Sequence, residues 1–277
     1  QVDPFIVMDV MEAARAAEAT GQDVIHMEVG QPGTPAPKLA RDGLNRAMEA
    51  GPLGYTVALG LPVLRERIAR HYGEVYGVDV APSRIVVTSG SSAGFILSFL
   101  SLFDAGQRVG IADPGYPSYR NILGALDLQA VRIEGTVANR FQPTVADITP
   151  DLDGLLVASP ANPTGSMLDR AALGALVQAC EAADVALISD EIYHGIEYEG
   201  RAVTALELTD DVFVINSFSK YFSMTGWRIG WMVVPDSHVR VLERLAQNLF
   251  ICPPHASQIA ALHAMDAGQE LDENAKV

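Results

Sequence analysis

Residues 212–228 read VFVINSFSKYFSMTGWR, and this stretch carries the strongest indication of fold and chemistry in the chain. An apolar, strand-like run, Val212–Ile215, leads directly to Lys220, which has serines on both sides and an arginine eight residues later. A lysine amine can bond covalently to an aldehyde, while hydroxyls and a guanidinium bind phosphate. The segment therefore predicts a site for a phosphorylated aldehyde. The alternative is a solvated lysine at a strand end, with serines capping a turn.

The rest of the chain places this strand in an α/β fold. Further short apolar runs predict buried strands at Arg84–Thr88, Arg108–Ala112, Ala130–Ile133, Leu155–Ala158, Val185–Ile188 and Ile229–Val234. Helical patterns cover residues 5–19, Ala93–Phe103, Arg170–Ala183 and Ala256–Ala267. Strands that are apolar on both faces and alternate with helices predict a mostly parallel central sheet with helices on both faces.

Composition narrows the classes of partner. The chain has 277 residues and a formal net charge of −15, which argues against nucleic acid or an anionic membrane as partner. We identify no membrane-spanning segment and no secretion signal. Cys180 and Cys252 lack metal or redox spacing, the histidines are not paired as metal ligands, and we predict no metal site. A reduced, cytoplasmic location is expected.

Polar residues follow five of the predicted strands. Because ligands of open α/β sheets bind beyond the carboxyl ends of the strands, these residues are expected to converge there. They are Gly90, Ser91 and Ser92 after the first strand, Tyr116 after the second, Asn162 after the fourth, Asp190 and Tyr193 after the fifth, and Ser217, Ser219 and Lys220 after the sixth.

Together these segments resemble the class I and II aminotransferases, the fold-type-I enzymes that use pyridoxal 5′-phosphate (PLP). The resemblance runs from about Gly30 to about Gln258. It implies an N-terminal arm and helix at 1–30, a large PLP-binding domain at 31–258, and at 259–277 the start of a connection to a small C-terminal domain. Family members continue into that small domain, which carries an arginine for the substrate carboxylate. We expect this chain to lack both.

The resemblance also assigns roles around the cofactor ring. Lys220 would form a Schiff base with PLP and then move a proton for the substrate. Asp190 would keep the pyridine nitrogen protonated, and Tyr193 and Asn162 would bind the phenolic oxygen. Tyr116 would stack on the ring. Glu191, adjacent to Asp190, would face the other way and be structural. Read alone, Tyr116 is a loop tyrosine and Asn162 part of an Asn-Pro turn.

Another set of residues would surround the phosphate and the substrate. Ser217, Ser219 and Arg228 would bind the phosphate with the turn at Gly90, Ser91 and Ser92, although simple serine N-capping also explains that turn. Tyr55 would reach the phosphate of a neighbouring subunit, which implies a homodimer. Gly30 would present its backbone N–H to the substrate carboxylate.

The function implied is transfer of an amino group between an amino acid and a 2-oxo acid. One alternative is a PLP-dependent C–S or β-elimination lyase of the same fold, because Lys220 and Asp190 would serve both reactions. Release of ammonia with a 2-oxo acid would distinguish the lyase. Another alternative is a non-catalytic PLP-binding module. The sequence does not identify the substrate pair.

Overall fold

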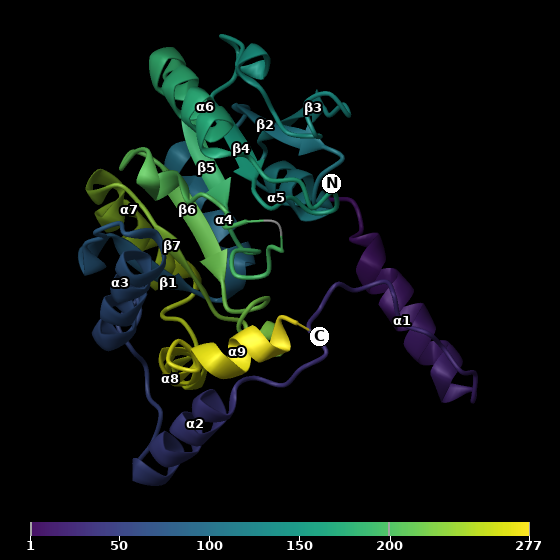
Figure 1. Cartoon of the computed structure of the whole chain (residues 1–277), viewed down its shortest axis with the longest axis vertical. Coiled ribbons are helices and arrows are strands. Elements are labelled where there is room, and N and C mark those ends of the chain that lie inside the picture. The colour runs from purple at the N-terminus through teal and green to yellow at the C-terminus, as the bar shows by residue number, and fades with distance from the viewer. Residues whose placement is uncertain (1, 199, 277) are drawn as a thin grey trace.

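The computed structural model of the chain describes residues 2–198 and 200–276. Its centre is a seven-stranded sheet with the strand order β1-β7-β6-β5-β4-β2-β3 (Figure 1). The strands are β1 (Ile85–Thr88), β2 (Arg108–Asp113), β3 (Gln129–Glu134), β4 (Gly154–Ala158), β5 (Ala186–Asp190), β6 (Phe213–Ser217) and β7 (Gly230–Val233). Pairing is parallel from β6 to β3, whereas β7 runs antiparallel to both β1 and β6. The predicted mostly parallel sheet is confirmed.

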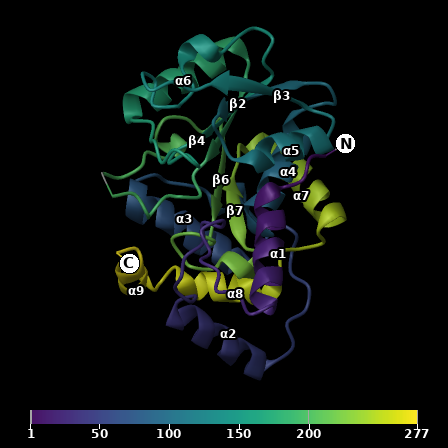
Figure 2. The ribbon, with the colours of Figure 1, turned by 90° about the vertical axis from the view of Figure 1, so that its right-hand side faces the viewer.

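Helices cover the sheet on both sides. In chain order, the helices of the described residues are α1 (Ile6–Ala19), α2 (Lys38–Ala50), α3 (Pro62–Tyr76), α4 (Gly90–Leu102), α5 (Pro117–Ala125), α6 (Arg170–Ala183), α7 (Asp236–Leu249), α8 (His255–Ala264) and α9 (Gly268–Asn274). Short 3-10 helices lie at Pro82–Arg84, Val145–Asp147, Ala205–Glu207 and Thr225–Trp227. Figure 2 shows α4, α5 and α7 on one side of the sheet and α3 and α6 on the other.

The two-sided apolar strands produce two cores. Leu155 and Val157 of β4 pack into the core formed with α3, α6 and α8, while Leu156 between them packs with α4, α5 and α7. Successive side chains of a strand point to opposite faces, so a strand covered on both sides must be apolar at every position. This is why the predicted strand segments show no alternation of apolar and polar residues. The polar residues begin where the covered part of each strand ends, at one edge of the sheet.

The N-terminal helix is present but is not part of either core. α1 projects from the body of the molecule (Figure 1), and none of its residues is buried. Val10, one of the apolar residues of this helix, is 46% exposed. The periodic apolar pattern therefore predicted the helix correctly, but the apolar side chains of the helix are not buried against the rest of this chain.

The C-terminal prediction needs a correction. The helix predicted over Ala256–Ala267 is present but ends at Ala264, and a further helix that was not predicted, α9, follows it. Leu271 explains the difference, since this leucine in a mostly polar stretch is 1% exposed and packs into the core. The backbone N–H of Lys38, at the start of α2, also donates to the Glu270 carboxylate at 2.9 Å.

The domain limits stay a prediction. The proposed boundary at residue 258 falls inside α8, which packs against α2. As for the bilayer, no helix within the described ranges combines the length and apolar character needed to cross one.

Candidate active site

The polar residues predicted at the strand ends lie along one edge of the sheet. Asp190 is the last residue of β5 and pairs in register with Ala158, the last residue of β4. Ser217 ends β6 and pairs with Gly230, which begins the antiparallel β7. The loops that follow these strands therefore start side by side, and their side chains meet in three groups.

The first group forms around Arg228. A Cβ on Gly90 would lie 2.3 Å from the Arg228 Nη2 atom, so only glycine leaves room for the guanidinium against the start of α4. Arg228 Nη1 donates to the Thr225 carbonyl at 2.8 Å and lies 3.5 Å from Ser219 Oγ. Arg228 itself has a φ of +50°, a left-handed conformation that non-glycine residues adopt mainly where the surrounding structure imposes it, as at binding sites.

The serines of this group complete an anion-binding arrangement. The Ser219 N–H donates to Ser217 Oγ at 3.0 Å, and the two hydroxyls lie 3.0 Å apart. Ser89 precedes α4, but within the described residues its side chain makes no capping hydrogen bond. The N–H groups of the first turn of α4, around half-buried Ser91 and exposed Ser92, therefore donate no hydrogen bond to the Ser89 side chain. A helix start, two hydroxyls and a guanidinium together favour a phosphate.

The second group surrounds Asp190, whose side chain is 2% exposed. Its Oδ1 accepts the Ile192 N–H at 3.1 Å, and its Oδ2 accepts a hydrogen bond from the Tyr119 hydroxyl. Burial raises the pKa of Asp190 to about 6, although the hydrogen bonds from Tyr119 and Ile192 oppose this shift. A carboxylate in such surroundings is costly unless a cation faces it.

Tyr119 is a site residue that the sequence analysis did not identify. It lies on α5, three residues after Tyr116, and the two rings meet edge to face with centroids 5.4 Å apart. This spacing of three, which places side chains on the same side of a helix, was the available signal. Tyr116 also meets the ring of Phe5 at 5.8 Å, which places the beginning of the chain beside the site.

The third group joins the loops after β4, β5 and β6. Asn162 Nδ2 donates to the Tyr193 hydroxyl at 3.3 Å, and Lys220 Nζ lies 5.5 Å from the centroid of the Tyr193 ring. Burial and nearby Asp190 raise the pKa of Tyr193 to about 12, so its hydroxyl keeps its proton at neutral pH. The Asn162–Pro163 peptide bond in this loop is cis.

Lys220 has the properties of a reactive amine. Burial and the positive charge of Arg228 lower its pKa, while Asp190 opposes the shift. A lowered pKa leaves more of the amine unprotonated and able to bond to a carbonyl carbon. Lys220 Nζ donates to the Gly30 carbonyl at 2.6 Å, so the predicted substrate loop lies directly beside it. In the structure the carbonyl of Gly30, rather than its N–H, faces the lysine.

Two predicted assignments lie outside these groups. Tyr55 is 84% exposed, and its proposed role in a neighbouring subunit stays a prediction. Glu191 is buried, with a carboxylate oxygen that accepts the Ser189 hydroxyl at 3.0 Å and the Ala205 N–H at 2.8 Å. These contacts support its structural interpretation.

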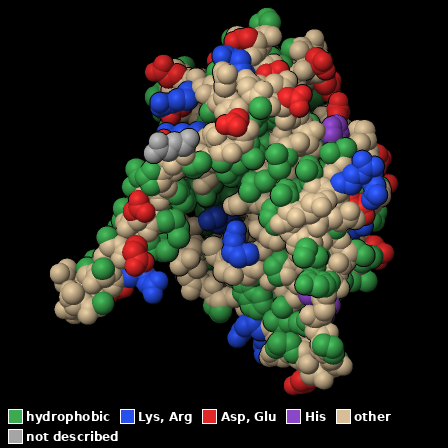
Figure 3. Space-filling model, turned by 180° about the vertical axis from the view of Figure 1, so that it is seen from behind, with side chains coloured by type: hydrophobic (Ala, Val, Ile, Leu, Met, Phe, Trp, Pro, Cys, Tyr) green, Lys and Arg blue, Asp and Glu red, His purple; other side chains and the backbone are tan. Residues whose placement is uncertain are grey.

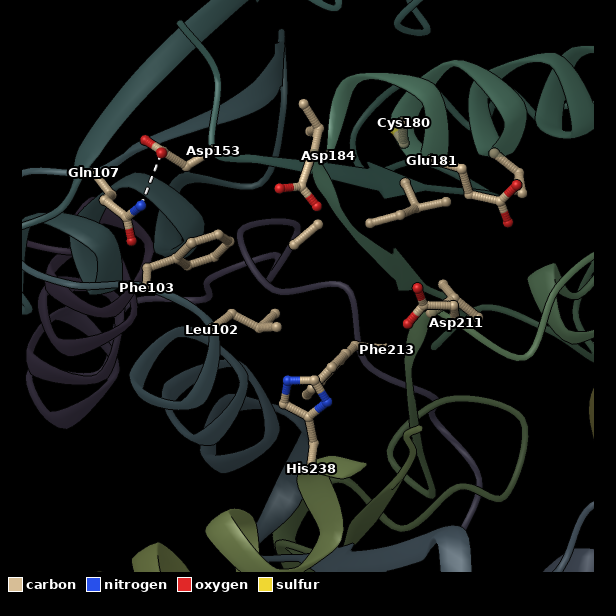
Figure 4. A pocket seen from close by; sticks show the side chains of 15 residues that line it. Leu102, Phe103, Gln107, Asp153, Cys180, Glu181, Asp184, Asp211, Phe213 and His238 are labelled. Carbon is tan, nitrogen blue, oxygen red and sulfur yellow. Dashed lines mark hydrogen bonds between the residues drawn. The ribbon is translucent and has the colours of Figure 1, made fainter. Parts of the chain in front are cut away.

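Cavities lie both at this edge and away from it. One of about 470 Å³ is lined by Asn162 and Tyr193, and its volume suits a small organic molecule. Another, of about 460 Å³, lies at the opposite ends of β5 and β6 (Figure 4) and contains none of the predicted residues. Phe103, Phe213 and His238 line it together with several carboxylates. Among the described residues, no three potential ligands gather to hold a metal ion.

Known proteins share this sequence and fold. The sequence model of the family described as aminotransferase class I and II matches residues 22–277. The valine–pyruvate aminotransferase of Mycobacterium tuberculosis is 48% identical over 280 residues, which cover 99% of this chain and 72% of that protein.

Solved structures of similar proteins have the same fold. A protein of Silicibacter pomeroyi is 63% identical and superposes with a TM-score of 0.92 over 100% of this chain and 72% of its own. The aspartate aminotransferase of Thermus thermophilus, determined with maleate, is 28% identical, with a TM-score of 0.94 over 99% of this chain and 74% of its own.

Proposed function

Because the chain belongs to the class I and II aminotransferase family, whose members are PLP-dependent enzymes, we propose that it transfers amino groups between an amino acid and a 2-oxo acid at the edge occupied by Lys220, Asp190 and Arg228. The observation that carries this proposal is the grouping of a buried carboxylate, a lysine of lowered pKa and a guanidinium with hydroxyls in one site.

The residues of this edge fit PLP by their chemistry. Arg228, Ser217, Ser219 and the start of α4 offer donors for a dianionic phosphate. Buried Asp190 offers a carboxylate to a protonated ring nitrogen, which supplies the cation that its surroundings lack. Tyr193 and Asn162 offer hydrogen bonds to a phenolic oxygen, and Lys220 offers an amine to the aldehyde carbon.

When bound, PLP supplies an electron sink that makes the α-hydrogen of an attached amino acid acidic. The chain's own residues do the rest. Asp190 holds the proton on the ring nitrogen, and Lys220 Nζ accepts the proton from the substrate α-carbon and returns it as a general base and acid. Its lowered pKa suits both roles, because a larger fraction of the amine is then unprotonated at a given pH.

For the substrate, we propose an apolar amino acid with a small 2-oxo acid. The support is the 48% identity to a valine–pyruvate aminotransferase, which exceeds the 28% identity to the Thermus aspartate aminotransferase. The cavity of about 470 Å³ beside Asn162 and Tyr193 has room for such a molecule.

An absorbance scan tests the function directly. Purified protein with PLP is expected to develop a cofactor band that changes on adding valine and returns on adding pyruvate, with aspartate and 2-oxoglutarate as the comparison pair. Alanine produced in proportion to the valine consumed would demonstrate transfer. Ammonia released with a 2-oxo acid would instead favour elimination, and a band unaffected by any amino acid would contradict both reactions.

We also propose that the active unit is a homodimer. Tyr55, Val57, Leu249 and Ile251 are between 50% and 84% exposed. The two segments that carry them lie side by side, because the Thr56 N–H contacts Cys252 Sγ at 3.4 Å. Figure 3 shows hydrophobic side chains gathered around a hollow that contains Lys or Arg side chains. A second copy that covers Tyr55 and its apolar neighbours would remove this surface from water.

A mixed dimer tests whether Tyr55 acts across the interface. Tyr55→Phe alone should weaken PLP binding about 10- to 100-fold, the value of one hydrogen bond to a charged group. Mixing the Tyr55→Phe chain with a Lys220→Ala chain should restore activity, because one site of each mixed dimer then receives an intact Tyr55 and an intact Lys220. No recovery after exchange of subunits, or a monomer by ultracentrifugation, would contradict the proposal.

A further inference from the structure

A buried histidine joins two of the loops that carry the site. His194 follows Tyr193 directly and is 6% exposed. Its Nε2 lies 2.9 Å from the carbonyl oxygen of Ser159, the residue that begins the loop containing Asn162. Its Nδ1 lies 2.8 Å from the hydroxyl of Tyr76 on α3. The imidazole therefore connects its own turn to two other segments of the chain, the loop after β4 and helix α3.

The hydrogen-bond partners define how the ring is used. A carbonyl oxygen can only accept, so Nε2 must carry a hydrogen. In the neutral ring Nδ1 is then an acceptor for the Tyr76 hydroxyl. Burial, followed by the charge of Glu191, raises the pKa of Tyr76, so this hydroxyl keeps the proton that it donates. Both ring nitrogens are occupied, and the imidazole has a fixed orientation.

The charged and titratable groups around the ring are consistent with this. From its own turn, Glu191 Oε2 lies 3.7 Å from Nδ1 and has no hydrogen-bond partner in the described part of the chain. His71 on α3 has its pKa lowered to about 4, chiefly by burial, and is neutral. Arg201 lies over the Tyr76 ring at 5.1 Å. At 3.7 Å the Glu191 oxygen is beyond hydrogen-bond distance of Nδ1, so it does not compete with the Tyr76 hydroxyl for that nitrogen.

Resting on the function proposed above, we propose that His194 is a positioning residue for the hydrogen bonds that Asn162 and Tyr193 make to the phenolic oxygen of PLP. The imidazole holds the Ser159 carbonyl at a set distance from the turn that carries Tyr193. The Asn162 and Tyr193 side chains, three residues after Ser159 and one before His194, meet at 3.3 Å. Without this connection, the Asn162 amide and the Tyr193 hydroxyl are no longer held so that both point at the phenolic oxygen.

The expected signature is spectroscopic. Hydrogen bonds to a phenolic oxygen stabilise its anionic form, so they lower the pH at which the bound cofactor's absorbance changes with protonation. His194→Phe keeps a flat ring but neither nitrogen, and should raise that pH by about one unit. His194→Gln can still donate to the Ser159 carbonyl and should stay within about a third of that shift. Tyr76→Phe, which releases only the Nδ1 side, should shift it upward by less than His194→Phe.

The controls separate positioning from general destabilisation. Leu242→Ala removes a fully buried side chain of α7 and should lower the melting temperature without moving the absorbance transition. A His194→Phe protein that titrates like the wild type would overturn the inference. If that variant does not fold, an unshifted Tyr76→Phe protein would overturn it equally. A wild-type chain that forms no cofactor band would instead contradict the proposed function, and with it this inference.

Discussion

Lys220→Ala is expected to eliminate covalent attachment of PLP and to reduce amino transfer by roughly 10⁴-fold or more, the scale seen when a covalent catalytic group is removed. The physical reason is the combination of properties found at this residue. Lys220 Nζ lies beside the Tyr193 ring, its pKa is lowered by burial and by Arg228, and it is close enough to Asp190 to be affected by that charge.

The small number of lysines makes the attachment site easy to identify. The sequence contains three lysines, Lys38, Lys220 and Lys276. After treatment with borohydride, which reduces a Schiff base to a stable amine, peptide mapping therefore has three positions to distinguish. Lys38 is the matched control, because its side chain is 72% exposed and forms an ion pair with Asp42. Lys38→Ala should leave the label and the turnover unchanged.

A label that persists in Lys220→Ala would show that another amine holds the cofactor. Loss of the label with normal turnover would show that attachment is not required. Adding a small primary amine offers a further readout, since it can supply the missing proton transfer and should partly restore activity if Lys220 acts as the base.

The sequence predicted the sheet well because its strands are covered on both sides. A run such as Leu155–Val157 is apolar at every position. The polar residue that follows each run marks the carboxyl edge of the sheet, where ligands of open α/β sheets generally bind. The site residues at strand ends were therefore visible one by one. That these residues lie near one another was an expectation from topology. The registers of β4 with β5 and of β6 with β7 show that the loops carrying them begin side by side.

The residues that sequence reasoning did not find act through neighbours that are distant along the chain. Tyr119 contacts Asp190, and His194 contacts Ser159 and Tyr76, over separations from 35 to 118 residues. A tyrosine or histidine on an apolar background has no local pattern that distinguishes a packed side chain from a positioning one. The helix α9 was missed for a related reason. Leu271 is a single leucine among mostly polar residues, and the other contacts of α9, from the Lys38 N–H and the Tyr221 hydroxyl, come from distant parts of the chain.

Asp190→Asn is expected to stabilise the cofactor-free protein while removing most of its activity. Burial raises the pKa of Asp190 to about 6 in the folded protein, against 3.8 as its ordinary value. Between these two pH values the folded chain holds a proton that the unfolded chain has lost, so the stability of the folded state falls as the pH rises. The shift of about two pH units corresponds to roughly 3 kcal/mol.

Chemical unfolding of the cofactor-free proteins between pH 4 and 8 measures this. The difference in unfolding free energy between wild type and Asp190→Asn isolates the one carboxyl, because the other groups titrate in both proteins. The variant should gain stability relative to the wild type as the pH rises from about 4 to about 6, and the gain should then level off. A difference that does not change with pH would contradict the raised pKa.

Activity should change in the opposite direction. An amide cannot balance the charge of a protonated ring nitrogen, so turnover should fall about 10²- to 10³-fold, in line with losing one partner of a buried ion pair. Tyr119→Phe is the graded control, because it removes one hydrogen bond to Asp190 and keeps the carboxylate. The turnover of Tyr119→Phe should lie between those of the wild type and Asp190→Asn. The unfavourable burial of Asp190 in the free protein is then relieved by the cofactor. Near-normal turnover in Asp190→Asn would show that the reaction does not need the carboxylate.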